Sequence, residues 1–345
     1  MNLRTFVPHV LRIRLNKLFG RDRRIASKDF LRDFGRFWAY SGLAHPQSPD
    51  ALLAKTIMAY HVLEKGLTMP ERRLGFGKDV VVRLMTLIQA YVERYGRDNR
   101  QVCHAIGVLK EYRDLHVGKQ QDCCEAEKAF WRTLDAFLSD YVTVTVARQM
   151  HVTRDDFFSR IDCPFPKFAQ SRHTVRNYTQ EDVSIEKIVE AVKIAMTAPS
   201  ACNRQYVRVH CITDKDACVQ LLALQKGNRG FGHLANKVIV VTADLEGIDS
   251  AGERNDVYTN GGIFLMNLCY ALHYCRIAHC ILNWSRSEAD DNAARELLGE
   301  QLKKSETIVA VLSCGVAPES FDVAASPRKE LNEVLVVHGQ NRGAS

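Results

Sequence analysis

The chain has 345 residues, of which 46% are hydrophobic and 25% are charged. This length favours two folded units, and the composition is that of a globular protein, which excludes extensive disorder, collagen-like repeats and a membrane-embedded body. The net charge of +7 lies in residues 1–28, which hold eight Lys or Arg and one Asp, so the remainder sums to zero. We therefore expect no nucleic-acid partner for the folded part.

The eleven cysteines are an odd number and contain no Cys-x-x-Cys pair. Because the chain also opens without the apolar core of a signal peptide, we expect reduced thiols in a cytoplasmic protein, and no metal site. The uncharged stretch from Val257 to Cys275 approaches the length of a membrane span, but it contains Asn260, Asn267 and His273. This polarity predicts a buried core helix.

Residues 1–28 are predicted to form a basic amphipathic tail. Apolar residues recur at helical spacing from Leu3 to Phe19, and arginines lie between and after them. Such a helix binds the surface of an anionic membrane, or it packs on its own protein with the charged face in solvent. The sequence leaves peripheral membrane contact and internal packing open.

Residues 29–165 are predicted to form an all-helical module without strands. Within it, His61 and Glu64 lie one helical turn apart, and such a pair shares a metal or packs as a hydrogen-bonded pair. A di-iron bundle needs further Glu-x-x-His pairs, which the module lacks, so the packing pair is favoured. The predicted helices are 30–40, 51–64, 78–95, 100–117 and 125–141.

Residues 166–338 alternate between helical patterns and β-branched runs, which predicts an α+β domain. Residues 339–345 are expected to be a flexible C-terminus. The predicted strands are 206–213, 237–243, 278–284 and 307–314, with a last extended piece from Glu333 to His338. The predicted helices are 184–196, 215–224, 256–274 and 287–298.

Two polar clusters of this domain are candidates for chemistry. In the run Ser171 to Tyr178, alternate spacing predicts that Arg172, Thr174 and Arg176 point to one side of an extended segment, as a ligand with a phosphate and a ring requires. The loop at 198–205 leaves a helix and enters a strand, and its Ser200, Asn203 and Gln205 suit a polyhydroxyl chain or a heterocycle edge. The alternative for this loop is an Asx-type turn that satisfies its own backbone.

The third cluster, Ser326-Pro327-Arg328-Lys329, would supply positive charge to the same anion or form a solvated turn. In this order the three clusters resemble the nitroreductase family of flavoproteins, whose pattern is Ser-Arg-x-Ser/Thr-x-Arg, then Ala-Pro-Ser-x-x-Asn-x-Gln, then a late basic residue. The resemblance extends from about Lys167 to His338. The helical module resembles an extension found on a subgroup of these proteins, some encoded near polysaccharide-biosynthesis genes.

The resemblance implies a nitroreductase-like sheet flanked by helices, with FMN bound at a homodimer interface. It also implies hydride transfer from NADH or NADPH to an electron-poor small molecule of nitro, quinone or enone type. Arg172 and Arg328 match the ligands of the FMN phosphate, and Ser200, Asn203 and Gln205 match the loop that reaches the flavin of the partner subunit. The remaining candidates beside the phosphate or ring are His173, Thr174, Arg176 and Lys329.

For catalysis we expect Arg176 to place positive charge near the flavin ring and a backbone N–H near Asn283 to donate to it. Many family members continue the loop as Gln-Pro-Trp, whereas here Gln205 is followed by Tyr206 and Val207, so the pocket wall differs. The alternative function is therefore a binding or assembly protein that keeps the fold without turnover, associated with a membrane in polysaccharide biosynthesis. The substrate and the choice between NADH and NADPH stay open.

Overall fold

The computed structural model describes residues 20–117, 124–142 and 148–338. The chain divides into two compact units, which we call the sheet unit (up to Ser41, and Val152–Phe321) and the helical unit (Gly42–His151, and Asp322 onward). These bounds differ from the predicted ones at residues 28 and 165. The difference arises because helix α2 (Arg21–Tyr40) runs across residue 28, and because the chain after Phe321 returns to the helical unit.

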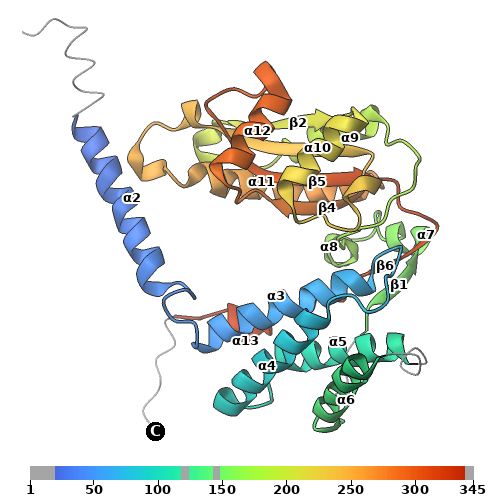
Figure 1. The fold of residues 1–345 in the computed structure, drawn as a ribbon. Helices are drawn as coiled ribbons and strands as arrows, with labels where there is room; N and C mark the ends of the chain where they lie inside the picture. Colours follow the sequence, from blue (N-terminus) through green and yellow to red (C-terminus); the bar gives the residue numbers. More distant parts are fainter. Residues whose placement is uncertain (1–19, 118–123, 143–147, 339–345) are drawn as a thin grey trace, which may run out of the picture. The chain divides into compact units, whose positions relative to one another are not determined.

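The helical unit contains four helices at their predicted places (Figure 1). They are α3 (Pro49–Leu67), α4 (Lys78–Tyr95), α5 (Arg100–His116) and α6 (Glu125–Ser139). Side-chain caps begin two of them, since Ser48 accepts from the Ala51 N–H and Asn99 accepts from the N–H groups at the start of α5. Their apolar faces form one core, which includes Leu63, Leu84, Ile88, Leu109 and Leu134.

The sheet unit is built on a four-stranded antiparallel sheet of order β2-β3-β5-β4. The strands are β2 (Val207–Ile212), β3 (Lys237–Asp244), β4 (Ala278–Asn283) and β5 (Glu306–Gly315), close to the predicted ranges. Every residue of β3 is buried. Because side chains alternate across a strand, both faces of the sheet are covered, as the α+β prediction requires.

Four long helices cover the sheet (Figure 1): α9 (Ile185–Ala195), α10 (Lys215–Gln225), α11 (Asp256–Tyr274) and α12 (Glu288–Leu298). Helices α9 and α11 pack in one core with Ile239 and Val241 of β3. Helix α10 contacts β3 and α12, and neither α10 nor α12 contributes to that core, so they lie against the other face. The prediction that residues 257–275 form a buried core helix is confirmed.

Shorter elements account for the wrong predictions. Strand β1 (Met150–Thr153) pairs with β6 (Ser320–Val323), although no strand was expected before residue 166. The expected strand at 333–338 is absent, because Glu330 and Glu333 form a capping box that starts the turn α13 (Leu331–Val334). The other short helices are α7 (Arg154–Phe158) and α8 (Phe165–Ser171), with 3-10 turns at 201–203, 232–234, 245–247, 251–253 and 299–301.

The predicted tail falls mainly outside the described residues, since only Gly20 to Lys28 of it is described. Those residues lead into α2, which has no buried residue. Asp33 joins α2 to the rest of the sheet unit, because the Arg254 guanidinium donates to both of its carboxylate oxygens at 2.7 and 2.9 Å. Within the described ranges, no helix combines the length and the apolar character needed to cross a bilayer.

Adjacent glycines of α11 allow a matched test of how this helix packs. A Cβ on Gly261 would lie 2.7 Å from Val309 Cγ2 of β5, whereas a Cβ on Gly262 would meet no atom within 4 Å. We expect Gly261→Ala to lower the free energy of unfolding by about 1–3 kcal/mol through overpacking. Gly262→Ala should raise it by about 0.5–1 kcal/mol through helix propensity.

Urea unfolding of both variants beside the parent protein measures the two effects. Equal changes in the two variants would contradict the close packing of α11 on β5.

Candidate functional site

The first cluster begins where α8 ends, at Ser171. The Ser171 hydroxyl donates to the Phe168 carbonyl at 2.8 Å, so the contact of its oxygen with His273 Nε2, at 2.9 Å, makes that nitrogen the donor. His273 belongs to α11. The turn that precedes Arg172 is therefore tied to the C-terminal end of the central helix.

Arg172 is a half-buried cation without an acidic partner. Its Nε atom is buried without a hydrogen bond, and the guanidinium has no ion pair among the described residues. The nearby buried side chains are His273 and His279, and their neutral forms supply no negative charge. Burial is the largest cause that lowers the pKa of His273 to about 3 and that of His279 to about 4, and the positive charge of Arg172 contributes to both shifts. The donors of Arg172 thus remain available to an anion.

His279 adds a second unpartnered polar atom at this place. Its Nδ1 lies 3.1 Å from the Ile277 carbonyl, which makes Nδ1 the donor and leaves the buried Nε2 as an acceptor without a partner. Neither His273 nor His279 is among the predicted site residues. The signal that distinguishes these two histidines is their burial among apolar residues of α11 and β4. That burial results from tertiary packing, so the sequence alone does not reveal it.

The other residues of the first cluster lie along the segment that follows Arg172. His173 and Thr174 are half-buried, and Arg176 is 8% exposed. The Val175 N–H donates to the His279 carbonyl, which aligns the segment with β4. Asn283 lies four residues further along β4, about 13 Å from His279 at strand spacing.

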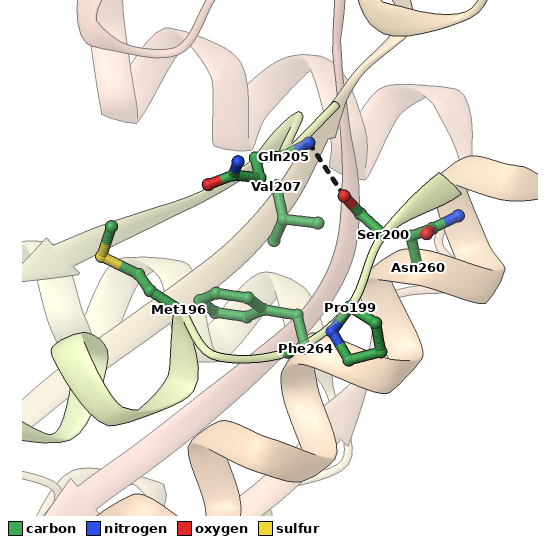
Figure 2. A pocket seen from close by; sticks show the side chains of 8 residues that line it. Met196, Pro199, Ser200, Gln205, Val207, Asn260 and Phe264 are labelled. Atoms are coloured by element: carbon green, nitrogen blue, oxygen red, sulfur yellow. Dashed lines mark hydrogen bonds between the residues drawn. The ribbon is translucent and has the colours of Figure 1, made fainter. Parts of the chain in front are cut away.

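The second cluster forms a tight loop that satisfies much of its own polarity. Ser200 Oγ accepts from the Gln205 N–H at 3.0 Å (Figure 2). Gln205 Nε2 donates to the backbone and side-chain oxygens of Asn203 at 3.1 Å. Cys202, Asn203 and Gln205 all have φ between 50° and 55°. The turn alternative thus describes the hydrogen bonding, while three left-handed residues in one loop mark a strained backbone of the kind found at ligand sites.

Two side chains outside the predicted set hold this loop in place. Asn260 of α11 accepts from the Ala201 N–H at 2.8 Å. Arg204 donates to the Gly247 carbonyl and to Glu253, each at 2.8 Å. The loop is therefore anchored to α11 and to the turns that precede it.

A cavity of about 90 Å³ adjoins the loop, and Figure 2 shows Met196, Phe264 and Val207 beside Ser200 and Gln205. Cofactor and ligand sites usually enclose several hundred Å³, so this cavity alone is too small for a flavin. The exposed Asn203 and Gln205 lie at the surface of the same loop. Any large ligand on this loop requires a further wall.

The first and second clusters lie at opposite ends of α11. Asn260 contacts the loop of the second cluster, and His273 contacts Ser171 of the first. Thirteen residues separate these two contacts, which is about 20 Å along a helix. Within one chain the structure does not bring Arg172 together with Ser200, Asn203 and Gln205.

The third cluster belongs to the helical unit. Arg328 and Lys329 are exposed, and neither forms an ion pair with a described residue. Arg328 donates to the Ser326 carbonyl at 2.7 Å, and Ser326 has a φ of 41°. The joint action of Arg172 and Arg328 on one phosphate therefore stays a prediction.

Glu64 lies beneath the third cluster as a fully buried carboxylate. It accepts from His104 Nε2 at 2.7 Å, from His61 Nδ1 at 3.3 Å and from the Ser326 N–H at 3.4 Å. Burial raises the pKa of the Glu64 carboxyl, but the two histidine hydrogen bonds outweigh burial and lower this pKa to about 2. The predicted packing pair of His61 and Glu64 forms, but the shortest contact comes from His104 of α5, which the local spacing could not reveal.

Metal ligation and reactive thiols have no support in the described ranges. No three His, Cys, Asp or Glu side chains gather there as metal ligands would. The described cysteines form no disulfide, and burial raises the pKa of the Cys218 and Cys269 thiols to about 11 and 12. These two thiols therefore stay protonated and act as small apolar groups.

Comparison with known proteins adds a family match and distant structural likeness. Residues 169–228 match the sequence model of the nitroreductase family. The chain is 23% identical to a protein from Desulfovibrio desulfuricans, provisionally assigned as a nitroreductase and solved with FMN, over 51% of this chain and 97% of that one, with a TM-score of 0.42. No curated protein matches the chain.

Two structures from Clostridium difficile show a similar likeness. One is an FMN-dependent nitroreductase with 21% identity, 50% of this chain and 98% of that chain covered, and a TM-score of 0.40. The other is a nitroreductase family protein with 20% identity, 51% and 99% covered, and a TM-score of 0.42. The matched segment 169–228 contains both the Arg172 segment and the Ser200 loop, so these two clusters lie in the part of the chain that is similar to the nitroreductase family.

Proposed function

We propose that the protein is an FMN-dependent oxidoreductase that takes hydride from NADH or NADPH and reduces an electron-poor small molecule of nitro, quinone or enone type. The unpaired Arg172 is the observation that carries this proposal. A guanidinium with a buried, unpartnered N–H and no acid nearby is costly unless an anion completes it. A phosphate is the anion that best matches its planar donors.

The other predicted site residues are assigned to the phosphate or the ring of the flavin by their charge and hydrogen-bonding groups. Arg328 and Lys329 add two exposed cations that form no ion pair with a described residue, which suits the phosphate. His173, Thr174 and Arg176 follow Arg172 along one segment and are assigned to the phosphate or ring. Bound FMN would supply the hydride chemistry, while the charge of Arg176 and a backbone N–H near Asn283 would favour the electron-rich reduced ring.

The test of this proposal is the identity of the bound cofactor. Purified protein should be yellow, and denaturation should release a compound with the spectrum and mass of FMN in about one copy per chain. The holoprotein should then oxidise NADH or NADPH in the presence of a quinone. Colourless protein that fails to take up added FMN would exclude the enzyme and favour the binding or assembly alternative.

The two assigned phosphate ligands allow a direct test by mutation. Arg172→Ala and Arg328→Ala should each weaken FMN binding by about 1.5–3 kcal/mol, because each removes a charge-assisted hydrogen bond to the phosphate. Isothermal titration of the apoprotein with FMN measures both losses. Arg83→Ala, at an exposed position of α4, is the control and should keep the parent affinity.

If both arginines hold one phosphate, the double variant should lose less affinity than the sum of the two single losses. Parent affinity in both single variants would contradict the assignment.

We also infer that the protein is a homodimer in which two chains line each flavin site. The separation of about 20 Å along α11 and the small cavity beside Ser200 support this, because one chain leaves the second cluster without its own phosphate site. Ser200, Asn203 and Gln205 would then contact the FMN whose phosphate is bound by the partner subunit's Arg172.

Removal of FMN should lower the melting temperature and the dimer fraction together, because a ligand that binds only the assembled state stabilises it by mass action. Sedimentation velocity of holoprotein and apoprotein at matched dilutions measures the dimer fraction. A monomer that keeps one FMN per chain would contradict the shared site.

A cytoplasmic location with peripheral contact to the inner face of the membrane completes the proposal. It is supported by the charge excess of residues 1–28 and by the aromatic side chains that α2 exposes, with Phe30, Phe34 and Trp38 each 57–65% exposed. The full chain should co-sediment with vesicles that contain phosphatidylserine at low salt, and less so at high salt. Removal of residues 1–19 should weaken this binding without loss of FMN. Absence of sedimentation at low salt would contradict membrane contact.

A further inference from the structure

The segment 325–329 carries two cations on a strained backbone. Ser326 has a φ of 41°, a left-handed conformation that a non-glycine residue keeps only where its surroundings enforce it. Arg328 folds back to donate to the Ser326 carbonyl at 2.7 Å. The position of the Arg328 guanidinium is therefore coupled to the backbone of Ser326.

Three side chains of the helical unit hold this segment through its backbone. Gln149 Oε1 accepts from the Ala325 N–H at 2.9 Å, Glu64 Oε1 accepts from the Ser326 N–H at 3.4 Å, and Gln101 Nε2 donates to the Pro327 carbonyl at 3.4 Å. Glu64 and Gln101 are buried, at 0% and 3% exposure. These two buried side chains contact the backbone of the segment from the protein interior, whereas Arg328 and Lys329 remain exposed to solvent.

Glu64 and Gln101 belong to a connected network of polar side chains. Glu64 is held by His104 and His61, and Gln101 Oε1 accepts from the Tyr60 hydroxyl at 2.6 Å. The Tyr60 ring packs edge-on against the His104 ring at a centroid distance of 5.0 Å. Each group that contacts Ser326 or Pro327 is thus oriented by a second buried group, which limits its movement.

The geometry points to Glu64 as a positioning residue for the binding of the cofactor phosphate. The inference rests on the proposed function and deepens it, because it concerns how Arg328, which is assigned to the phosphate, is held in place. The carboxylate fixes the Ser326 N–H, the left-handed Ser326 fixes its carbonyl, and that carbonyl orients Arg328. Gln101 acts beside it on Pro327. Neither side chain is required to touch the cofactor.

The experiment compares FMN with riboflavin, which lacks the phosphate. Glu64→Gln removes the charge that holds His104, His61 and the Ser326 N–H together, so FMN affinity should fall about tenfold, the effect of about one hydrogen bond. Riboflavin affinity should stay the same. Gln101→Leu, which removes only the contact with Pro327 and the Tyr60 acceptor, should show the same selective loss if Glu64→Gln does not fold.

Glu306→Gln is the matched control, because Glu306 is also 0% exposed in its side chain and is held by His210 at 2.7 Å and Thr242 at 2.6 Å in the sheet unit. It should alter FMN and riboflavin binding equally or not at all. Two results would overturn the inference. One is a ratio of FMN affinity to riboflavin affinity that is the same in the folded Glu64→Gln and Gln101→Leu variants as in the parent protein. The other is a ratio that changes as much in Glu306→Gln as in Glu64→Gln. Parent protein that binds neither flavin overturns the proposed function itself.

Discussion

The buried carboxylate of Glu64 organises the helical unit. A carboxylate without exposure to water is tolerated only when donors surround it, and removal of one partner of such a buried pair typically costs about 3–5 kcal/mol. Here the donors come from α3, from α5 and from the backbone after β6. One charge thus links the first helix of the unit, a neighbouring helix and a stretch of chain that lies 262 residues further along the sequence.

The candidate site of the sheet unit shows the opposite case, a charged side chain without an ion-pair partner among the described residues. Arg172 has no acidic partner in the part of the chain that the structure describes, although acidic side chains pair with arginines elsewhere, as Asp33 does with Arg254. Its surroundings are histidines that burial keeps neutral. An open cation of this kind is a candidate for ligand binding.

The helical extension gains a physical role from these contacts. Arg328 bonds locally to the Ser326 carbonyl, so its geometry depends on how the backbone of Ser326 is fixed. The backbone contacts from Glu64, Gln101 and Gln149 supply that constraint. The strain of Ser326 is thereby offset by the packing of the helical unit.

The sequence by itself determined most of the secondary structure and the first two polar clusters. Helix α4 has an apolar face at helical spacing, and strands β2, β3 and β5 are rich in β-branched residues, so local pattern and propensity set these elements. Strands β1 and β6 were missed because each has four residues, too few for a pattern, and forms only by pairing across the fold. The capping box at Glu330 and Glu333 was missed for a different reason, because the apolar residues within 333–338 favoured the prediction of a strand there.

Only the tertiary structure decided which charges are paired. The spacing of His61 and Glu64 predicted a local contact, but the shorter bond from His104 and the bond from Ser326 join residues distant in sequence. The open guanidinium of Arg172 and the acceptor nitrogen of His279 likewise depend on what α11 and β4 place around them. Periodicity records which face of an element is apolar, whereas the partner of a buried polar atom is set by the packing of whole elements.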